Sequence, residues 1–228
     1  LAAAMQDYKR AIIIGSKQTY GKGTVQNVLD LNRMVRSNTN GDLGALKFTT
    51  QKYYRINGGS TQLEGVKSDI VVPDKYTYVD FGEKDQENPL EWDKIDPVSY
   101  EPWKSLFDYN KTIDASKNRM KSSEFISLID ENAKWIKSIR DRNIYTLNYS
   151  KFKKDLLLNE EKAKKYKKLS DYSSDLIFKS LPYEIDLIAK DSSLGEKRKR
   201  WHKNLSKDIY VNESLNVLND LRLSYVER

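Results

Sequence analysis

The segment Ala11-Ile12-Ile13-Ile14-Gly15 decides the fold of the first part of the chain. It is a continuous apolar run that ends in glycine, which is typical of a strand buried on both faces of a sheet. The ten residues before it carry apolar side chains at Leu1, Met5 and Tyr8, which is the spacing of a helix. A helix that leads into a buried strand indicates an α/β arrangement for this part of the chain.

The opening residues also indicate that the chain is a piece of a longer protein. The stretch Leu1-Ala2-Ala3-Ala4-Met5 begins inside an apolar helical pattern, without an N-capping residue and without an initiator methionine. We therefore expect further sequence before Leu1.

Three more strands are predicted downstream, at 24–31, 45–57 and 65–72. The second is rich in β-branched and aromatic residues, and four apolar residues in it share one parity: Leu46, Phe48, Tyr54 and Ile56. This alternation predicts a half-buried strand. The pair Gly58-Gly59 then predicts a hairpin turn.

The second half of the sequence changes character. Residues 74–103 are rich in Asp, Glu, Asn and Pro, which suits a surface connection. Beyond them, helices are predicted at 122–142, 151–168 and 212–225. The predicted class is therefore α+β, with a partial α/β domain at 1–78, a connector at 79–103 and a mostly helical C-terminal domain at 104–228.

The composition narrows the functional classes. A chain of 228 residues with 38% hydrophobic and 11% aromatic residues can build a core, and no apolar run approaches the roughly 20 residues that span a bilayer. The sequence has no cysteine, which excludes disulfides, thiolate zinc sites and cysteine nucleophiles within it. The single histidine, His202, lies in a basic run without metal-ligand spacing. We predict a solvated surface side chain there and no metal site.

The net charge of +7 comes entirely from the second half. Residues 1–100 hold 13 Lys or Arg and 13 Asp or Glu, whereas residues 101–228 hold 27 and 20. This shift suggests two parts with different partners. The basic runs Lys162–Lys168 and Lys197–Lys203 could contact phosphates, with Trp201 stacked on a base. Runs that contain Tyr and Leu are more often solvated helix faces, which is the interpretation we favour.

The stretch Tyr20-Gly21-Lys22-Gly23-Thr24-Val25-Gln26 is the candidate for chemistry. Glycine lacks a Cβ, so the chain on both sides of Lys22 can bend tightly and let another group approach. A lysine that is shielded from water can lose its proton and act as a general base, and Gln26 could orient the amine without adding a charge. Four residues of extended strand span about 13 Å, so a bend or the reach of both side chains must close the gap. An exposed loop lysine between turn glycines is the alternative, which the heptapeptide by itself favours.

Further motifs follow Lys22 in order along the chain: Arg55-Ile56-Asn57-Gly58-Gly59-Ser60-Thr61-Gln62, Gly65-Val66-Lys67-Ser68-Asp69-Ile70, Asn88-Pro89-Leu90-Glu91-Trp92-Asp93-Lys94-Ile95 and Arg142-Asn143-Ile144-Tyr145-Thr146-Leu147-Asn148-Tyr149. Together with the helix at 1–8, the strand at 12–15 and the glycine-lysine-glycine motif, they resemble the carboxy-terminal processing (tail-specific) protease family. The last two motifs resemble the long periplasmic members that carry a helical C-terminal extension. The resemblance covers most of the chain.

Members of that family are serine endopeptidases with a Ser/Lys dyad in place of a triad. The resemblance implies that Lys22 is the general base, that Gln26 orients it and that residues 1–78 complete the serine-protease catalytic domain. The family's nucleophile lies in a Ser-Ala-Ser-Glu run at the start of the helix whose tail matches Leu1–Tyr8, so this fragment is expected to be inactive alone. Ser68 stands where many members have proline, a difference that affects a turn.

The resemblance also implies protein or peptide substrates with apolar C-terminal tails and a location in the periplasm or cell envelope. It calls for no cofactor and no nucleic acid, and it allows an adaptor protein and inner-membrane association of the full-length protein. The alternatives are a non-enzymatic basic binding module and a degenerate protease scaffold. Strong, salt-sensitive binding to nucleic acid would favour the binding module.

Overall fold

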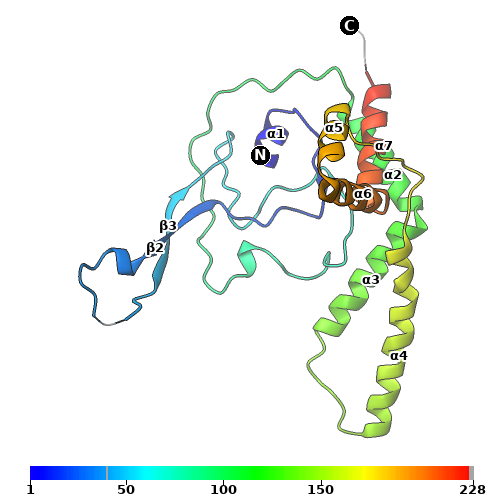
Figure 1. Ribbon diagram of the computed structural model, residues 1–228, viewed down its shortest axis with the longest axis horizontal. Helices are drawn as coiled ribbons and strands as arrows, with labels where there is room; N and C mark the ends of the chain where they lie inside the picture. The colour runs from blue at the N-terminus through cyan, green and yellow to red at the C-terminus, as the bar shows by residue number, and fades with distance from the viewer. Residues whose placement is uncertain (40, 226–228) are drawn as a thin grey trace. The chain divides into compact units, whose positions relative to one another are not determined.

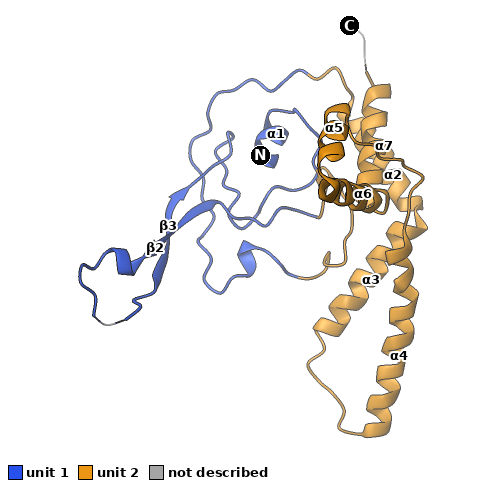
Figure 2. Cartoon of the chain, viewed as in Figure 1, with its two compact units in different colours: residues 1–13, 17–68, 80–104 blue, residues 14–16, 69–79, 105–228 orange. Residues whose placement is uncertain are grey.

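The computed structural model describes residues 1–39 and 41–225 (Figure 1). The chain divides into two compact units (Figure 2). Unit 1 comprises residues 1–13, 17–68 and 80–104, and unit 2 comprises residues 14–16, 69–79 and 105–228. The described strands all lie before residue 72, and helices dominate from Tyr109 onward, which confirms the predicted α+β class.

Unit 1 contains a short helix and a β-ribbon. The helix α1, Ala2–Asp7, confirms the helical pattern at the start of the sequence. Strand β2, Thr24–Asp30, pairs antiparallel with β3, Ala45–Lys52, so the predicted strand at 45–57 ends earlier than expected. The predicted turn at Gly58-Gly59 is confirmed, because the backbone N–H of Arg55 donates to the carbonyl of Gly59 at 2.7 Å.

The prediction of a half-buried strand is wrong for β3. Every residue of β3 is exposed, including Leu46 and Phe48 on the apolar side of the alternation. The reason is that β2 and β3 form a ribbon of two strands, and the exposure of every β3 residue shows that no second layer of the described residues covers either face of it. Asn40 lies outside the described residues, between the two strands.

A second small sheet belongs to unit 2. Strand β1, Ile14–Gly15, pairs parallel with β4, Ile70–Val71, and the carbonyl of Gly15 accepts a hydrogen bond from Val72 N at 2.8 Å. Ile70 and Val72 are fully buried, but Ile14 is only half-buried. The predicted burial of residues 11–15 on both faces is therefore wrong, since all five residues are only half-buried and the strand among them is two residues long.

Six helices make up most of unit 2: α2 (Tyr109–Ser122), α3 (Glu124–Arg140), α4 (Tyr149–Lys167), α5 (Pro182–Lys190), α6 (Ser192–Ser206) and α7 (Ile209–Leu223). The helices α3, α4 and α7 confirm the three predicted ones with ends shifted by a few residues. A 3₁₀ helix, Lys168–Asp171, follows α4 directly. The helices α2, α5 and α6 were not predicted as separate helices, because α5 is short and the polar residues of α2 and α6 leave little apolar periodicity.

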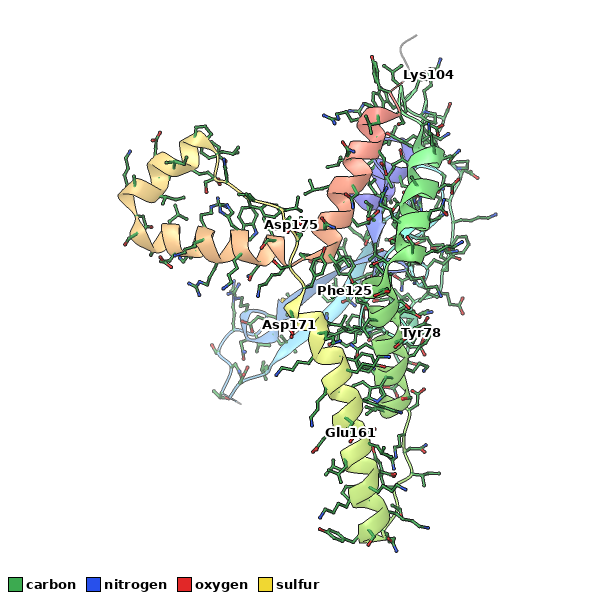
Figure 3. The ribbon with its side chains drawn as sticks, turned by 90° about the vertical axis from the view of Figure 1, so that its right-hand side faces the viewer. Tyr78, Lys104, Phe125, Glu161, Asp171 and Asp175 are labelled. Carbon is green, nitrogen blue, oxygen red and sulfur yellow. The ribbon has the colours of Figure 1, made fainter. Side chains whose placement is uncertain are left out.

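The helix α3 shows how local sequence sets the helical packing. The hydroxyl of Ser123 accepts a hydrogen bond from Ile126 N at 3.3 Å and caps the first turn. Ile126, Ile129 and Ala133 follow at helical spacing, and all three are buried. The helices α3 and α4 form an antiparallel hairpin whose contacts include the Trp135 and Tyr166 rings, 5.3 Å apart (Figures 1 and 3).

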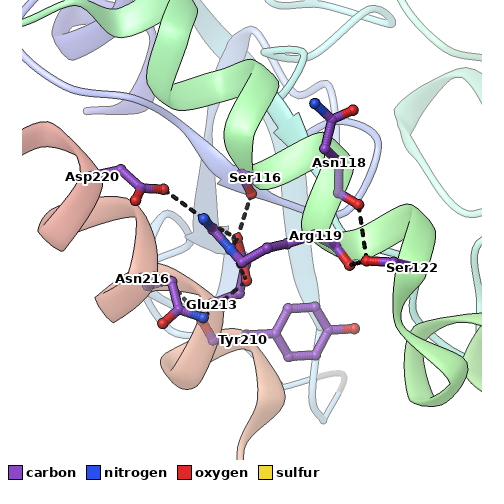
Figure 4. A network of polar contacts seen from close by, with 9 residues as sticks. Ser116, Asn118, Arg119, Ser122, Tyr210, Glu213, Asn216 and Asp220 are labelled. Carbon is purple, nitrogen blue, oxygen red and sulfur yellow. Dashed lines mark hydrogen bonds and ion pairs between the residues drawn. The ribbon is translucent and has the colours of Figure 1, made fainter. Parts of the chain in front are cut away.

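A polar network joins α2 to α7 (Figure 4). The buried carboxylate of Glu213 accepts hydrogen bonds from the Ser116 hydroxyl at 2.5 Å and from Arg119 Nη2 at 2.8 Å, and Arg119 Nη1 lies 2.7 Å from Asp220 Oδ2. Burial by itself raises the pKa of Glu213, but the hydrogen bonds from Arg119, Ser116 and Asn216 outweigh it and hold the pKa below its ordinary value. The network is thus a fully paired buried charge in unit 2.

Candidate functional site

The glycine-lysine-glycine motif lies against the segment 60–65 of unit 1. A Cβ added at Gly21 would lie 2.9 Å from the carbonyl oxygen of Leu63, and one added at Gly23 would lie 2.7 Å from Gln62 N. Gly21 also has a φ of +91°, a conformation that disfavours residues with side chains. Glycine is therefore required on both sides of Lys22, for close backbone approach at both positions and for conformation at the first.

Hydrogen bonds to the segment 60–65 fix the backbone on both sides of Lys22. Leu63 N donates to the carbonyl of Gly21 at 2.7 Å, and Gly23 N donates to Gln62 Oε1 at 2.8 Å. The Lys22 carbonyl accepts from the Thr61 hydroxyl at 3.1 Å and from the Tyr53 hydroxyl. These contacts pair the carbonyls of Gly21 and Lys22 and the N–H of Gly23, and they hold the backbone at Lys22 in one conformation.

Gln62 is the residue that organises this loop, and the sequence interpretation gave it no role. Its side chain is completely buried and uses its oxygen for Gly23 N, while its Nε2 donates to Leu90 O at 3.0 Å and to Glu83 Oε1 at 3.3 Å. A buried amide whose donors and acceptor all have partners cross-links three separate segments of unit 1. The available signal was its place at the end of the motif Arg55–Gln62, shortly after the turn at Gly58-Gly59.

The Lys22 side chain pairs with a carboxylate. Its Nζ lies 3.8 Å from Glu83 Oε1, and 35% of the side chain is exposed, against 12% for Glu83. Glu83 lies in the 3₁₀ helix Glu83–Asp85, and its N–H donates to the carbonyl of Tyr20 at 2.9 Å. An ion pair of this kind forms with the ammonium form of the lysine. Sequence reasoning missed Glu83, which lies 61 residues from Lys22 in a stretch interpreted as a connector.

Gln26 occupies a different environment from Lys22. It is exposed on β2, opposite Thr49 of β3, and no hydrogen bond joins the side chains of Lys22 and Gln26 in the part of the chain that the structure describes. The pairing of β2 with β3 shifts between Val25 and Gln26, which marks a β-bulge. A bulge alters which way the following side chains point, so Gln26 does not simply continue the alternation that begins at Thr24.

An apolar cavity of 580 Å³ lies beside the Lys22 loop in unit 1, and its lining includes Tyr53 and Thr61, which both donate to the Lys22 carbonyl. Aliphatic and aromatic residues from α1 and from the segments after β3 line most of it, among them Ala4, Tyr8, Tyr53, Ile56 and Val98. Such a lining suits an apolar side chain or an extended apolar peptide.

A partly buried ion pair between Arg55 and Asp7 holds α1 beside this cavity. Arg55 Nε donates to Asp7 Oδ2 at 3.0 Å, and Arg55 Nη2 donates to Gln6 Oε1 at 3.0 Å. The forked guanidinium therefore contacts two successive residues at the end of α1, which fixes the orientation of that helix in unit 1. Both Asp7 and Arg55 belong to the lining of the cavity.

A second charged group lies at the end of β3. Lys52 Nζ is 2.8 Å from Asp93 Oδ2, and the Tyr54 hydroxyl donates to the same oxygen at 3.0 Å. The hydrogen bond from Lys52 is the main reason that the pKa of Asp93 lies below its ordinary value. Burial, followed by the bond to Asp93, raises the pKa of the Tyr54 hydroxyl. These groups are paired with one another and act as a structural clamp.

Other classes of site find little support among residues 1–39 and 41–225. No group of three or more His, Cys, Asp or Glu side chains in this part of the chain is arranged to hold a metal ion. None of the helices described there is long and apolar enough to cross a membrane. His202 is half-exposed, with its ring 5.6 Å from that of Trp201, and the basic run of α4 has no buried residue.

Two protein families match successive parts of the chain. Residues 1–72 match peptidase family S41, and residues 76–222 match the C-terminal domain of tail specific protease (DUF3340). The chain belongs to the tail-specific protease family. This confirms the family resemblance and places the first part of the chain among the S41 serine proteases, with the helical part in a domain characteristic of tail-specific proteases.

Two named relatives show the extent of the similarity. A tail-specific protease from Haemophilus influenzae is 37% identical over 195 residues, which cover 83% of this chain and 27% of that protein. A carboxy-terminal-processing protease from Bartonella bacilliformis is 44% identical over 80 residues, 33% of this chain and 16% of that protein. The chain therefore spans about a quarter of the length of the first relative and less of the second.

Proposed function

We propose that this chain is part of a serine endopeptidase that cleaves proteins recognised by their C-terminal tails. Lys22 would be the general base of a Ser/Lys dyad, Gln26 its orienting partner, and the serine would lie upstream of Leu1. The observation that carries the proposal is the fixed loop around Lys22, in which both neighbouring glycines are locked onto the segment 60–65. General-base catalysis needs its base held in one position, which an ordinary surface lysine is not.

The division of labour along the chain follows from this role. Residues 1–78 would form part of the catalytic domain, 79–103 a connector and 104–228 a helical domain. The apolar cavity beside α1 supports a substrate with an apolar tail, because its lining would remove such side chains from water. The proposed location in the periplasm or cell envelope rests on the family resemblance. The absence of cysteine is compatible with the periplasm and equally with the cytoplasm.

The Glu83 carboxylate must be reconciled with a base at Lys22. With Nζ and Oε1 3.8 Å apart, the two groups form a long ion pair and not a tight hydrogen bond. The lysine side chain has a flexible stem of four carbons, so rotation about its bonds would carry the amine away from Glu83 and toward the hydroxyl of the serine. We propose that the ammonium form of Lys22 rests on Glu83 between reactions, and that the lysine releases this proton to solvent and turns away from Glu83 as a neutral amine, which then accepts the proton of the serine hydroxyl.

The deciding experiment compares Lys22→Ala with Lys47→Ala in the full-length protein that includes the upstream serine. Lys47 is exposed on β3, so the control removes a lysine from the same unit without touching the loop. Cleavage of an unfolded polypeptide with an apolar tail should fall by about 10²–10⁴-fold in Lys22→Ala and stay within about twofold in the control. Equal cleavage by wild type and Lys22→Ala would refute the dyad assignment.

A basic binding module is the second candidate, favoured by the many exposed lysines of α4 and α6. Binding to unrelated duplex and single-stranded DNA, measured over a range of salt concentrations, separates the two. Tight binding that falls steeply with salt, in a protein that does not cleave, would support the binding module. Cleavage that depends on Lys22, without such binding, would exclude it as the main function.

A further inference from the structure

A cavity of 610 Å³ in unit 2 has no role in the catalytic proposal. We call it the helical cavity, because its walls come from the start of α3, the end of α6 and the start of α7, together with residues 74–76 and 169–172. Its volume lies within the roughly 300–1,000 Å³ that is typical of ligand-binding pockets, whereas voids left by imperfect packing are far smaller. The helical cavity is therefore large enough to receive a side chain of another molecule.

Much of the lining of the helical cavity is apolar. Phe125 and Ile129 lie one turn apart on the same face of α3, and both belong to the lining. The ring of Phe125 (Figure 3) lies 4.7 Å from that of Tyr172. Leu169 and Ile209 complete the apolar part. An aromatic or branched apolar side chain that entered the cavity would leave water and pack against these rings and methyl groups.

Hydrogen bonds hold the walls of the helical cavity in place. The hydroxyl of Tyr210 donates to the carbonyl of Pro73 at 2.9 Å, which ties the start of α7 to the segment that follows β4. Asp208 Oδ1 accepts from Tyr210 N at 2.8 Å and caps α7. The N–H of Ser174 donates to the carbonyl of Ser206 at 2.7 Å, which ties the loop after α4 to the end of α6. Walls that are fixed beforehand lose little conformational entropy when a ligand binds.

Two side-chain amides belong to the polar part of the lining. They are those of Asn132 on α3 and Asn204 on α6, and neither forms a hydrogen bond within residues 1–39 and 41–225. Each amide offers two N–H donors and one carbonyl acceptor, which can pair with the C=O and N–H groups of a peptide backbone. Asn132 lies one turn beyond Ile129, so an amide stands directly beside the apolar lining.

The charged groups of the lining balance one another. Asp74 and Asp208 supply two carboxylates, and Lys75 and Lys207 supply two ammonium groups. A lining without net formal charge favours neither a phosphate group nor a strongly acidic or basic peptide. The ligand that suits this cavity is uncharged, with an apolar side chain for the lining and hydrogen-bonding groups for the two amides.

We propose that the helical cavity binds an extended, uncharged polypeptide segment that places one large apolar or aromatic side chain against Phe125 and Ile129. The amides of Asn132 and Asn204 would pair with the backbone of that segment. Such a segment needs no free C-terminus, so the cavity would hold an internal stretch of an unfolded protein and not its tail. That this protein is a substrate rests on the proposed function, whereas the binding itself does not.

Fluorescence anisotropy with the full chain of 228 residues tests the proposal. The probe is a short peptide of Gly, Ser and Asn with a single central phenylalanine, a fluorophore at its N-terminus and an amidated C-terminus. We expect this peptide to bind, and the same peptide with serine in place of phenylalanine to bind at least about tenfold more weakly. Equal binding of the two peptides, or no binding of the phenylalanine peptide to wild type, would overturn the proposal.

Variants of the lining and two matched controls localise the binding. Asn132→Trp fills the cavity from α3 and should weaken binding at least about tenfold, and Asn204→Ala should weaken it about threefold. Asn118→Trp adds the same ring at an exposed position of α2, and Ile177→Ser removes an isoleucine that is 83% exposed in the loop before α5. Both controls should bind within about twofold of wild type. Equal losses in the lining variants and the controls would mean unspecific adhesion and would refute the site.

A photochemical cross-link shows where the bound side chain lies. A probe with p-benzoylphenylalanine in place of its phenylalanine should label residues within 125–132, 169–172 or 204–210, as mapped by mass spectrometry. Labels confined to the apolar cavity of unit 1, or to exposed residues outside the lining, would contradict the proposal. The proposed serine lies upstream of Leu1, so these measurements on the 228-residue chain involve no cleavage. Peptide binding in unit 2 and the Ser/Lys dyad can therefore fail separately.

Discussion

The two units bury different kinds of residue. Among the described residues of unit 1, Val66 is the only hydrophobic side chain that is buried, and its other buried positions are glycines and polar residues such as Gln62 and Glu83. In unit 2 the buried set includes Ile70, Ile129 and other apolar side chains, with a few polar ones. Unit 1 is thus organised by close backbone approach and hydrogen bonds, whereas unit 2 is organised largely by apolar packing.

This difference bears on function. A site that must hold one amine in a fixed position gains from many directional hydrogen bonds, which define distances and angles. Packed helices tolerate changes of side chain as long as volume and pattern persist. We therefore expect the residues around Lys22 to respond to small steric changes, and the helices of unit 2 to respond mainly to loss of buried charge or of a cap.

The largest effect on stability should come from the polar network of unit 2. Arg119→Ala would leave the buried Glu213 carboxylate without its main partner, at a cost of about 2–3 kcal/mol in the free energy of unfolding. This is less than a fully buried pair would cost, because 35% of the Arg119 side chain is exposed. Urea unfolding followed by the helical circular dichroism signal measures it.

Two further variants sharpen that measurement. Arg222→Ala, an exposed arginine on α7, should change the stability by less than about 0.5 kcal/mol. Adding Glu213→Gln to Arg119→Ala removes the stranded charge and should recover part of the loss. If the double variant were no more stable than Arg119→Ala, the stranded charge would not be the cause of the loss, and the account of a paired buried charge would fail.

The next largest effect should come from the glycine loop of unit 1. Gly23→Ala places a methyl group 2.7 Å from both Gln62 N and Ser60 Oγ, and the backbone on either side is hydrogen-bonded in place. We expect a loss of about 2 kcal/mol, typical of overpacking. Gly59→Ala is the control, since its nearest contact would be 3.3 Å to the end of the Asn57 side chain. Thermal unfolding that ranks the two variants the other way would contradict the close approach.

A smaller effect on stability is expected from the N-cap of α3 in unit 2. Ser123→Ala removes the hydroxyl that accepts from Ile126 N and should destabilise α3 by about 1 kcal/mol. Ser138→Ala, in the last turns of the same helix, should change the stability by less than about 0.5 kcal/mol. Guanidinium unfolding of both variants gives the comparison. Equal stabilities would mean that the cap does not hold the start of α3.

The sequence predicts unit 2 better than unit 1, because apolar packing of helices leaves a periodic pattern in the sequence and close backbone approach does not. The spacing of Ile126, Ile129 and Ala133 repeats with the turn of a helix, so periodicity locates α3 closely. Close approach between Gly23 and Gln62 joins positions 39 residues apart and leaves no periodic trace. The alternation of Leu46 and Phe48 identified an apolar face of β3. It did not show whether another element packs against that face, and none of the residues of β3 is buried.

The pairing of Lys22 with Glu83 shows the same limit within the candidate site. The motif around Lys22 identified the lysine and the need for flanking glycines, both of which the loop geometry explains. It gave no indication of Gln62 or Glu83, because a buried amide and a distant carboxylate follow no local pattern. Gln26 remains a prediction from the family, to be tested together with Lys22.

The smallest expected effect concerns alkaline pH and returns to unit 2. Burial, with the nearby charges of Asp74 and Asp208, raises the pKa of Tyr210 from 10.0 to about 12, and its hydroxyl donates to the carbonyl of Pro73 at 2.9 Å. The folded chain therefore holds the proton that the unfolded chain loses above pH 10. The resulting stability is present below pH 10 and is lost as the pH rises toward 12.

At pH 11 this contribution should lower the free energy of unfolding by less than about 1 kcal/mol relative to pH 8, once solvent screening of a half-exposed group is allowed for. Tyr210→Phe should lose that part of the pH dependence, whereas Tyr183→Phe, at an exposed position of α5, should keep it. Urea unfolding at the two pH values isolates Tyr210 from other tyrosines with raised pKa, since they are present in every variant. If the free energy of unfolding of Tyr210→Phe fell between pH 8 and pH 11 as much as that of wild type, burial would not raise the pKa of Tyr210. The packing of unit 2 would then leave this hydroxyl in contact with water.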